Sequence, residues 1–171
     1  MPHKDKDKRS VGRTIQKDNL MSELREAYMD FLGMKSKAEK TEAAILARLS
    51  GREGVTVLLP FGGGNGRYDM VIDDSGTFYR VQCKTGRLEQ GGAVVAFNAG
   101  SSTYHYYNKR DKGEWRNYRG AVEYFGVYCP QINRAFLVPV DIVGSTEGKL
   151  RLVETKNKQS KNVHWAKDYE I

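Results

Sequence analysis

Apolar residues recur at helical spacing in two segments near the start of the chain. The first segment covers residues 19–32, and its apolar stripe consists of Leu20, Leu24, Tyr28 and Phe31. This spacing predicts an amphipathic helix, and Gly33 suits the position just beyond its end. The second helix is predicted over about residues 37–50, with a stripe formed by Ala38, Ile45 and Leu49.

A carboxylate falls on the stripe of the second predicted helix. Glu42 lies on the same face as Ala38 and Ile45. A buried carboxylate is costly unless it is paired or meets a cation. The pattern therefore leaves two interpretations. Either Glu42 contributes to a polar site, or it lies partly exposed at the edge of a stripe whose neighbours are small alanines.

The middle and end of the chain consist of strand-like runs separated by turns. Strands are predicted over residues 55–60, 68–73, 77–84, 93–97, 122–128, 135–140 and 150–153. The first run is continuously apolar, so we expect it to be buried. The second and third runs alternate, and the turn Asp74-Ser75-Gly76 between them predicts a β-hairpin. Helices followed by many strands predict an α+β or mixed α/β fold.

Length and segment composition suggest how the chain is organised. A chain of 171 residues suits one compact domain. We expect residues 1–34 to form a basic arm and an accessory helix, residues 35–142 the core, and residues 143–171 a basic C-terminal extension. No apolar run approaches the roughly 20 residues of a membrane span, and the charged N-terminus lacks the apolar region of a signal peptide. These features predict a cytoplasmic protein with no membrane partner.

The charge favours a polyanionic partner, whereas the cysteines argue against a zinc site. The net charge is +7 and the pI is about 9.4, a balance that suits DNA, RNA or anionic lipid. Cys83 and Cys129 each lie within an apolar strand-like run, and no CxxC pair is present. We therefore predict two buried, reduced thiols.

Cations and aromatic rings are concentrated in residues 104–119. The candidates for DNA contact in this segment are Tyr106, Tyr107, Lys109, Arg110, Lys112, Arg116 and Arg119. Lysine and arginine side chains would contact phosphates, and tyrosine rings would pack on sugars or bases. The alternative is a solvated surface loop whose aromatic residues cover the edge of the core. Arg67 and Arg87 are further candidates, and for Arg87 an ordinary surface arginine is the alternative.

One face of the predicted hairpin is polar. Side chains alternate along a strand, so Gln82 and Lys84 share a face, and Asp69 projects to the same side when Met70 faces the core. Carboxylate, amide and carbonyl oxygens, here from Asp69, Gln82 and the Cys83 backbone, are ligands that Mg²⁺ prefers. A lysine beside them can orient or deprotonate a water, or stabilise negative charge. This chemistry suits hydrolysis of a phosphodiester.

The order of these residues resembles the signature of the PD-(D/E)XK nucleases, in which a hairpin carries Asp and then Asp/Glu-x-Lys. The matching residues are Asp69, Gln82 and Lys84, and Tyr68 stands where the motif name has Pro. The segments PFGGGNGRYDMVID, VQCKTGR and VEYFGVYCPQINRAFLVPVD are together similar to a branch that includes group I intron-encoded homing endonucleases. That branch carries Gln at the second acidic position. The similarity covers about residues 37–142.

The resemblance implies a restriction-endonuclease-like core, with a mixed β-sheet flanked by helices. It also implies a Glu on the first core helix that supports the metal; Glu42 fits this role, and Glu39 is the competing choice. Mg²⁺ is the implied cofactor, with Mn²⁺ as a substitute, and the implied assembly is a homodimer or homotetramer. A neutral Gln82 is expected to bind Mg²⁺ more weakly than a carboxylate.

These features together predict a Mg²⁺-dependent endonuclease that hydrolyses double-stranded DNA, with site-specific, homing-type cleavage as the finer expectation. A Holliday junction resolvase with the same fold is one alternative. A non-cleaving DNA-binding protein on a nuclease scaffold is another, suggested by Gln82. An RNA-binding module would draw on the aromatic segment, but the strands carry no RRM-like aromatic motif.

Overall fold

The computed structural model describes residues 36–61, 66–103, 114–154 and 161–171 of the chain. Internal packing distinguishes two compact units, Met1–Lys40 and Thr41–Ile171, and the second contains nearly all of the described residues. The helix predicted at residues 19–32 lies outside the described residues. In the part of the chain that is described, no helix is long and apolar enough to cross a membrane.

The described residues form one α-helix followed by strands. The helix, α2, spans Lys37–Leu49. The strands are β1 (Val55–Leu58), β2 (Met70–Asp74), β3 (Thr77–Thr85), β4 (Arg87–Glu89), β5 (Val94–Asn98), β6 (Gly100–Thr103), β7 (Glu114–Asn117), β8 (Tyr124–Cys129), β9 (Arg134–Pro139) and β10 (Glu147–Arg151). Short 3-10 helices cover Gln90–Gly92, Val140–Ile142 and Ala166–Asp168. The second helix and the strands predicted from the apolar pattern are therefore all present, with ends shifted by a few residues.

A capping box fixes the start of α2. The Ser36 hydroxyl accepts a hydrogen bond from the Glu39 N–H at 3.1 Å, and the Glu39 carboxylate accepts one from the Ser36 N–H at 2.9 Å. These bonds satisfy N–H groups that have no partner within the helix. Further along α2, the buried residues are Thr41, Ile45 and Leu49, and Glu42 is half-buried beside them.

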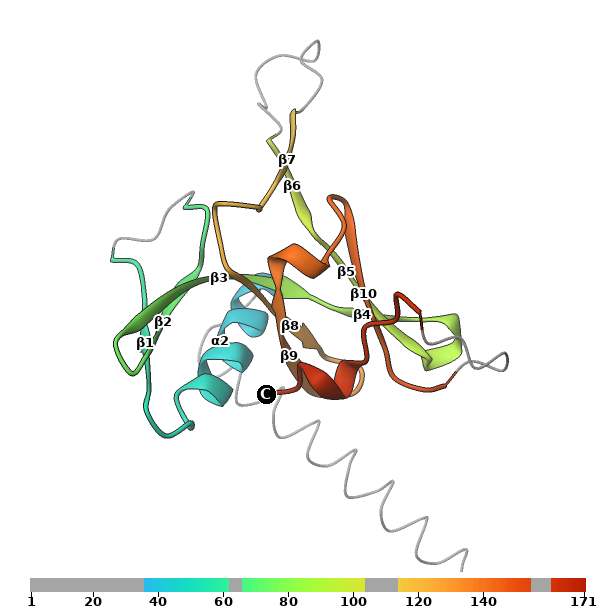
Figure 1. The fold of residues 1–171 in the computed structure, drawn as a ribbon, viewed down its shortest axis with the longest axis horizontal. Helices are drawn as coiled ribbons and strands as arrows, with labels where there is room; N and C mark the ends of the chain where they lie inside the picture. Colours follow the sequence, from blue (N-terminus) through green and yellow to red (C-terminus); the bar gives the residue numbers. More distant parts are fainter. Residues whose placement is uncertain (1–35, 62–65, 104–113, 155–160) are drawn as a thin grey trace, which may run out of the picture. The chain divides into compact units, whose positions relative to one another are not determined.

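A five-stranded mixed sheet forms the centre of the second unit, with the strand order β1-β2-β3-β8-β9 (Figure 1). Strands β1, β2 and β3 form an antiparallel meander, and β8 and β9 form an antiparallel pair. Strands β3 and β8 are parallel neighbours, so the chain must cross over between them, and it forms β4 to β7 on the way. The mixed sheet with its helix confirms the predicted fold class.

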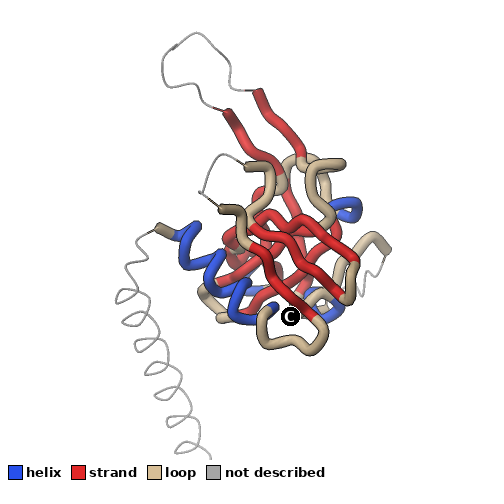
Figure 2. The backbone as a smooth tube through the Cα atoms, turned by 90° about the vertical axis from the view of Figure 1, so that its left-hand side faces the viewer, coloured by secondary structure: helices blue, strands red, loops and turns tan. Residues whose placement is uncertain are grey.

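Helix α2 packs on one face of this sheet and runs alongside its strands (Figure 2). Ile45 and Leu49 of the helix share a buried cluster with Val81 of β3. Gly126 of β8 permits the close approach, because a Cβ atom there would lie 3.0 Å from Ile45 Cγ2 and 3.2 Å from Val81 Cγ1. The apolar side of the hairpin therefore faces α2, which leaves its polar side on the opposite face.

The opposite face of the central sheet packs against a second sheet, with the order β10-β5-β4. The rings of Phe125 in β8 and Phe97 in β5 meet there at 5.6 Å. Leu150 and Ala166 are buried in the same core, so described residues after position 143 complete this domain. Both cysteines of the chain are free and buried, as predicted.

Strand β1 is more exposed than its sequence predicts. The apolar run at residues 55–60 was expected to be buried, but β1 is an edge strand whose residues alternate between half-buried and exposed. Leu58 is 45% exposed and Leu59 is 58% exposed. The prediction is wrong because only Val55 and Val57 pack against the core that contains α2. An apolar run does not reveal that a strand lies at the edge of its sheet.

Strands β6 and β7 form an antiparallel ribbon that the apolar pattern does not predict. The ribbon extends beyond the sheets (Figure 1), and Ser101 of β6 lies opposite Arg116 of β7. Its residues are largely polar and lack the alternation of a half-buried strand. Backbone pairing between the two strands therefore defines this ribbon, rather than burial of an apolar face.

Close packing of one aromatic ring against a glycine gives a test of the fold. Gly148 lies opposite Phe97, and a Cβ atom on Gly148 would lie 2.2 Å from Cζ of that buried ring. We predict that Gly148→Ala lowers the free energy of unfolding by about 1–3 kcal/mol, because the ring cannot move without repacking the core. Urea denaturation measures the change. Gly51→Ala is the control, since its Cβ would make only ordinary contacts at 3.7 and 3.8 Å; equal stability of the two variants would contradict the packing described.

Candidate active site

The hairpin of β2 and β3 brings Asp69 and Gln82 together. The Asp69 N–H donates to the Val81 carbonyl at 2.9 Å, which extends the pairing of Met70 with Val81 by one residue. The Asp69 side chain then accepts two hydrogen bonds at a single oxygen, Oδ2. The Gln82 amide donates from Nε2 at 2.5 Å, and the Cys83 backbone N–H donates at 2.6 Å. The expected polar face of the hairpin is thus present.

The surroundings of Asp69 suit a cation. Burial raises the pKa of the Asp69 carboxyl, while the Cys83 N–H, the positive charge of Lys84 and the Gln82 amide act in the opposite direction. Neither of the two hydrogen bonds uses Asp69 Oδ1 or Gln82 Oε1. These atoms are oxygen donors of the kind that Mg²⁺ prefers. A cation beside them would offset the cost of burying the carboxylate, so the residues present fit a divalent metal.

Lys84 shares the polar face of β3 and reaches the base of the β6–β7 ribbon. Its Nζ donates a hydrogen bond to Tyr118 Oη at 3.2 Å and a longer one to the Gly100 carbonyl at 3.5 Å. The same atom lies 4.5 Å from the centroid of the Tyr118 ring. The positive charge of Lys84 opposes the rise that burial causes in the pKa of Asp69. The ammonium group therefore lies within electrostatic reach of that carboxylate.

Glu42 comes from α2, next to Thr41 at the end of the helix that lies beside the end of β3. The helix is held there by a 2.7 Å hydrogen bond between the hydroxyls of Thr41 and Thr85. Burial raises the pKa of the Cys83 thiol, and the negative charges of Asp69 and Glu42 raise it further. Both carboxylates therefore act on the same thiol. Among the described residues, no group of three or more His, Cys, Asp or Glu could hold a metal, so the metal role of Glu42 stays a prediction.

Arg67 joins the loop before Asp69 to the β6–β7 ribbon. Its guanidinium donates to Ser101 Oγ at 3.2 Å and to the backbone carbonyl of Asn117. Its Cζ lies 4.3 Å from the centroid of the Tyr118 ring. Tyr118 thus touches both Arg67 and Lys84, although nothing in the sequence distinguishes it from the other tyrosines of residues 101–119.

The other residues expected to contact DNA are not gathered at the hairpin by any contact that the structure describes. Arg87 pairs with the carboxylates of Glu89 and Glu147, which offset its charge. Arg119 donates to the backbone carbonyl of residue 143 at 3.2 Å, and Arg116 is exposed on β7. Outside the described residues lie Tyr106, Tyr107, Lys109, Arg110 and Lys112.

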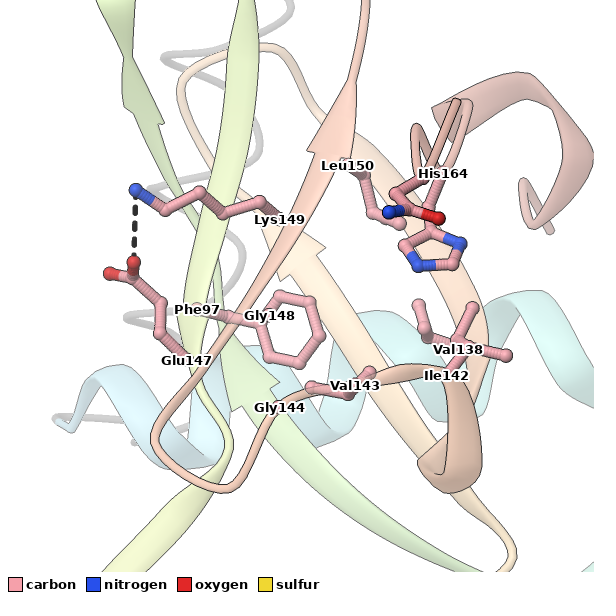
Figure 3. Close-up of a pocket in the computed structure, with 11 residues that line it drawn as sticks. Phe97, Val138, Ile142, Val143, Gly144, Glu147, Gly148, Lys149, Leu150 and His164 are labelled. Atoms are coloured by element: carbon pink, nitrogen blue, oxygen red, sulfur yellow. Dashed lines mark ion pairs between the residues drawn. The ribbon is translucent and has the colours of Figure 1, made fainter. Parts of the chain in front are cut away.

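A pocket of about 260 Å³ lies elsewhere, beside β10 (Figure 3). Phe97 and Leu150 line it together with His164, and Lys149 and Glu147 form an ion pair at its edge, 2.9 Å apart. None of the residues on the polar face of the hairpin lines this pocket. The chemistry suggested by the sequence therefore lies outside this pocket, at the half-buried polar face of the hairpin.

A mixed sheet whose hairpin carries an acid, then an amide and a lysine on one face, defines a PD-(D/E)XK nuclease core. The family model for PD-(D/E)XK endonucleases matches residues 32–171, and the chain belongs to this family. The structure is similar to that of a bacterial homing endonuclease, I-Ssp6803I, with a TM-score of 0.58 and 25% sequence identity. The match covers 78% of this chain and 86% of that one. No protein of curated function matches the chain.

Burial of Asp69 predicts a conflict between stability and function. Because its pKa is raised in the folded protein, its charge lowers stability as pH rises through the pKa values of the unfolded and folded states. We predict that Asp69→Asn melts at a higher temperature than wild type at pH 7 in EDTA. The difference should shrink as pH falls below about 4, the usual value for Asp. Thermal melts across pH measure this, with exposed Asp74→Asn as the control. A lower melting temperature for Asp69→Asn would contradict the prediction.

Proposed function

We propose that the protein is a Mg²⁺-dependent endonuclease that hydrolyses double-stranded DNA. Family membership supports nuclease activity, and the observation that carries the finer proposal is the polar face of the hairpin. There a half-buried carboxylate, a neutral amide and a lysine lie within reach of one another. The proposed site of action is inside the cell, where its substrate is found.

The residues proposed to hold the metal are Asp69 and Gln82 through their side chains, Cys83 through its backbone carbonyl, and Glu42 in support. When bound, Mg²⁺ neutralises charge on the phosphate and lowers the pKa of a water, and we propose that Mn²⁺ substitutes for it. The Gln82 amide keeps the Asp69 carboxylate oriented through its 2.5 Å hydrogen bond. A glutamate at position 82 would instead place two carboxylates in contact, which is costly until a cation is bound.

Lys84 is proposed to act as a positive charge and hydrogen-bond donor. Its contacts are with the Tyr118 hydroxyl, the Tyr118 ring and the Gly100 carbonyl, all of which are partners for an ammonium group. An ammonium group beside Asp69 can orient the attacking water and stabilise negative charge that develops on the phosphate.

DNA contact is proposed for the side of the domain that carries the β6–β7 ribbon. Arg67 and Arg116 are among its described cations, and the basic segment at residues 104–113 connects its two strands. The net charge of +7 supports binding to a polyanion. Because one active site cuts one strand, a double-strand break requires two subunits, which is why we propose a homodimer or homotetramer. Homing-type site specificity is proposed from the likeness to a homing endonuclease.

Cleavage assays on supercoiled plasmid, linear duplex and a four-way junction test the proposal. We predict cutting of duplex DNA with Mg²⁺ or Mn²⁺ and none in EDTA. Cutting confined to the junction would instead indicate a resolvase. No cutting with any metal, together with binding in EDTA, would indicate a fold kept for recognition alone.

Lys84→Ala is the decisive variant in these assays. We predict that its cleavage rate falls by on the order of 100-fold or more, because the charge beside Asp69 is lost. DNA affinity should change by less than about threefold, since binding is spread over many phosphate contacts. Lys149→Ala on β10 is the control and should cleave like wild type. A parallel loss of binding and cleavage in Lys84→Ala would argue against a catalytic role.

A further inference from the structure

Tyr118 is held firmly at the base of the β6–β7 ribbon. It follows β7 directly and is 5% exposed. Its ring packs edge-on against Phe125, with centroids 5.6 Å apart and an interplanar angle of 86°. The N–H groups of Ala121 and Val122 both donate to its carbonyl, at 2.9 and 3.1 Å. Both its backbone and its ring are therefore fixed by the core, so Tyr118 can hold other groups in place.

Two cations gather on this one ring. The Arg67 guanidinium lies 4.3 Å from the ring centroid and the Lys84 ammonium 4.5 Å, and Lys84 also donates to the hydroxyl. The face of an aromatic ring attracts each cation, but the two cations repel each other. Such an arrangement is favourable mainly when an anion lies near both of them.

Neither cation forms an ion pair with a carboxylate in the described part of the chain, although Lys84 lies within electrostatic reach of Asp69. Arg80, Arg87 and Arg134 each form an ion pair with a glutamate. Arg67 and Lys84 form none there, and their hydrogen bonds go to hydroxyl and carbonyl oxygens. Their charges are therefore available to an anionic ligand. Since Lys84 also acts on Asp69, that ligand would lie beside the candidate active site.

We propose that Tyr118 is a positioning residue that holds Lys84 and Arg67 on one ring, so that both cations face a single phosphate of the DNA backbone. The inference rests on the proposed nuclease function and names the residue that aligns its two cations. The Tyr118 hydroxyl accepts a hydrogen bond from Nζ of Lys84, and the ring lies against both Nζ and the Arg67 guanidinium. Because the hydrogen bond uses the hydroxyl and the cation–π contacts use the ring, their effects can be separated by mutation.

Two substitutions separate the hydroxyl from the ring. Tyr118→Phe keeps the ring and should slow single-turnover cleavage by about 10-fold, with the DNA dissociation constant in EDTA changed by less than about twofold. Tyr118→Leu loses both parts and should slow cleavage by about 100-fold. It should also reduce the salt dependence of binding by about one phosphate contact, because Arg67 loses the ring and keeps only its hydrogen bonds to Ser101 and Asn117. The control is Tyr128→Phe, which loses a 3.2 Å hydrogen bond to Asn133 and should cleave like wild type.

The outcomes distinguish this inference from the proposed function. If wild type cleaves and both Tyr118 variants match it, the inference is overturned while the nuclease function stands. It is also overturned if the loss of rate simply follows a loss of melting temperature that Tyr128→Phe shares. If wild type does not cleave, the proposed function fails, and the salt dependence of DNA binding alone tests the inference. A reduced salt slope in Tyr118→Leu would then support the shared phosphate contact, and an unchanged slope would overturn it.

Discussion

The candidate active site depends on one oxygen atom that accepts two hydrogen bonds. Asp69 Oδ2 receives the Gln82 amide at 2.5 Å and the Cys83 N–H at 2.6 Å. These bonds hold a carboxylate that burial alone would make unfavourable, and they leave its other oxygen and the Gln82 carbonyl oxygen for a cation. A neutral glutamine suits this arrangement better than a second acid while no metal is bound. Glutamine at position 82 therefore orients the Asp69 carboxylate without adding a second negative charge.

The fold supports this site by covering both faces of the central sheet. On one face, α2 packs closely over Gly126 and is pinned by the Thr41–Thr85 hydrogen bond. On the other, the second sheet buries Phe125, whose ring in turn supports Tyr118. The polar residues of β3 lie where this second core ends and the β6–β7 ribbon begins. A rigid sheet can hold a carboxylate and a lysine in fixed relation, as a nuclease site requires.

Local patterns in the sequence predicted much of the fold and the polar face of the hairpin. Strand alternation placed Asp69 and Gln82 on a common face, and the turn at residues 74–76 fixed the hairpin. A further signal was available at the start of α2, where Ser36 and Glu39 have the spacing of a capping box. This capping-box spacing would have assigned Glu39 to the first turn of the helix, and it would have left Glu42 as the better candidate for the site.

What the sequence did not predict depends on contacts between distant segments. The exposure of β1 follows from its place at the edge of the sheet, which an apolar run does not encode. The β6–β7 ribbon is defined by backbone pairing, so its side chains carry little signal. The contacts of Tyr118 could not be predicted from the sequence, because Lys84 and Arg67 lie more than 30 residues away from it along the chain. They meet only when β7, β3 and the loop before Asp69 come together in the fold.

Manganese binding tests the central claim most directly. The measurement is electron paramagnetic resonance of Mn²⁺ added to the Lys84→Ala protein with a short DNA duplex, compared with Lys84→Ala/Asp69→Asn. The account predicts that Lys84→Ala removes Mn²⁺ from the free signal and that the added Asp69→Asn substitution abolishes this binding. Equal binding by both proteins would mean that Asp69 does not hold the metal, and the hairpin would not be the nuclease centre described.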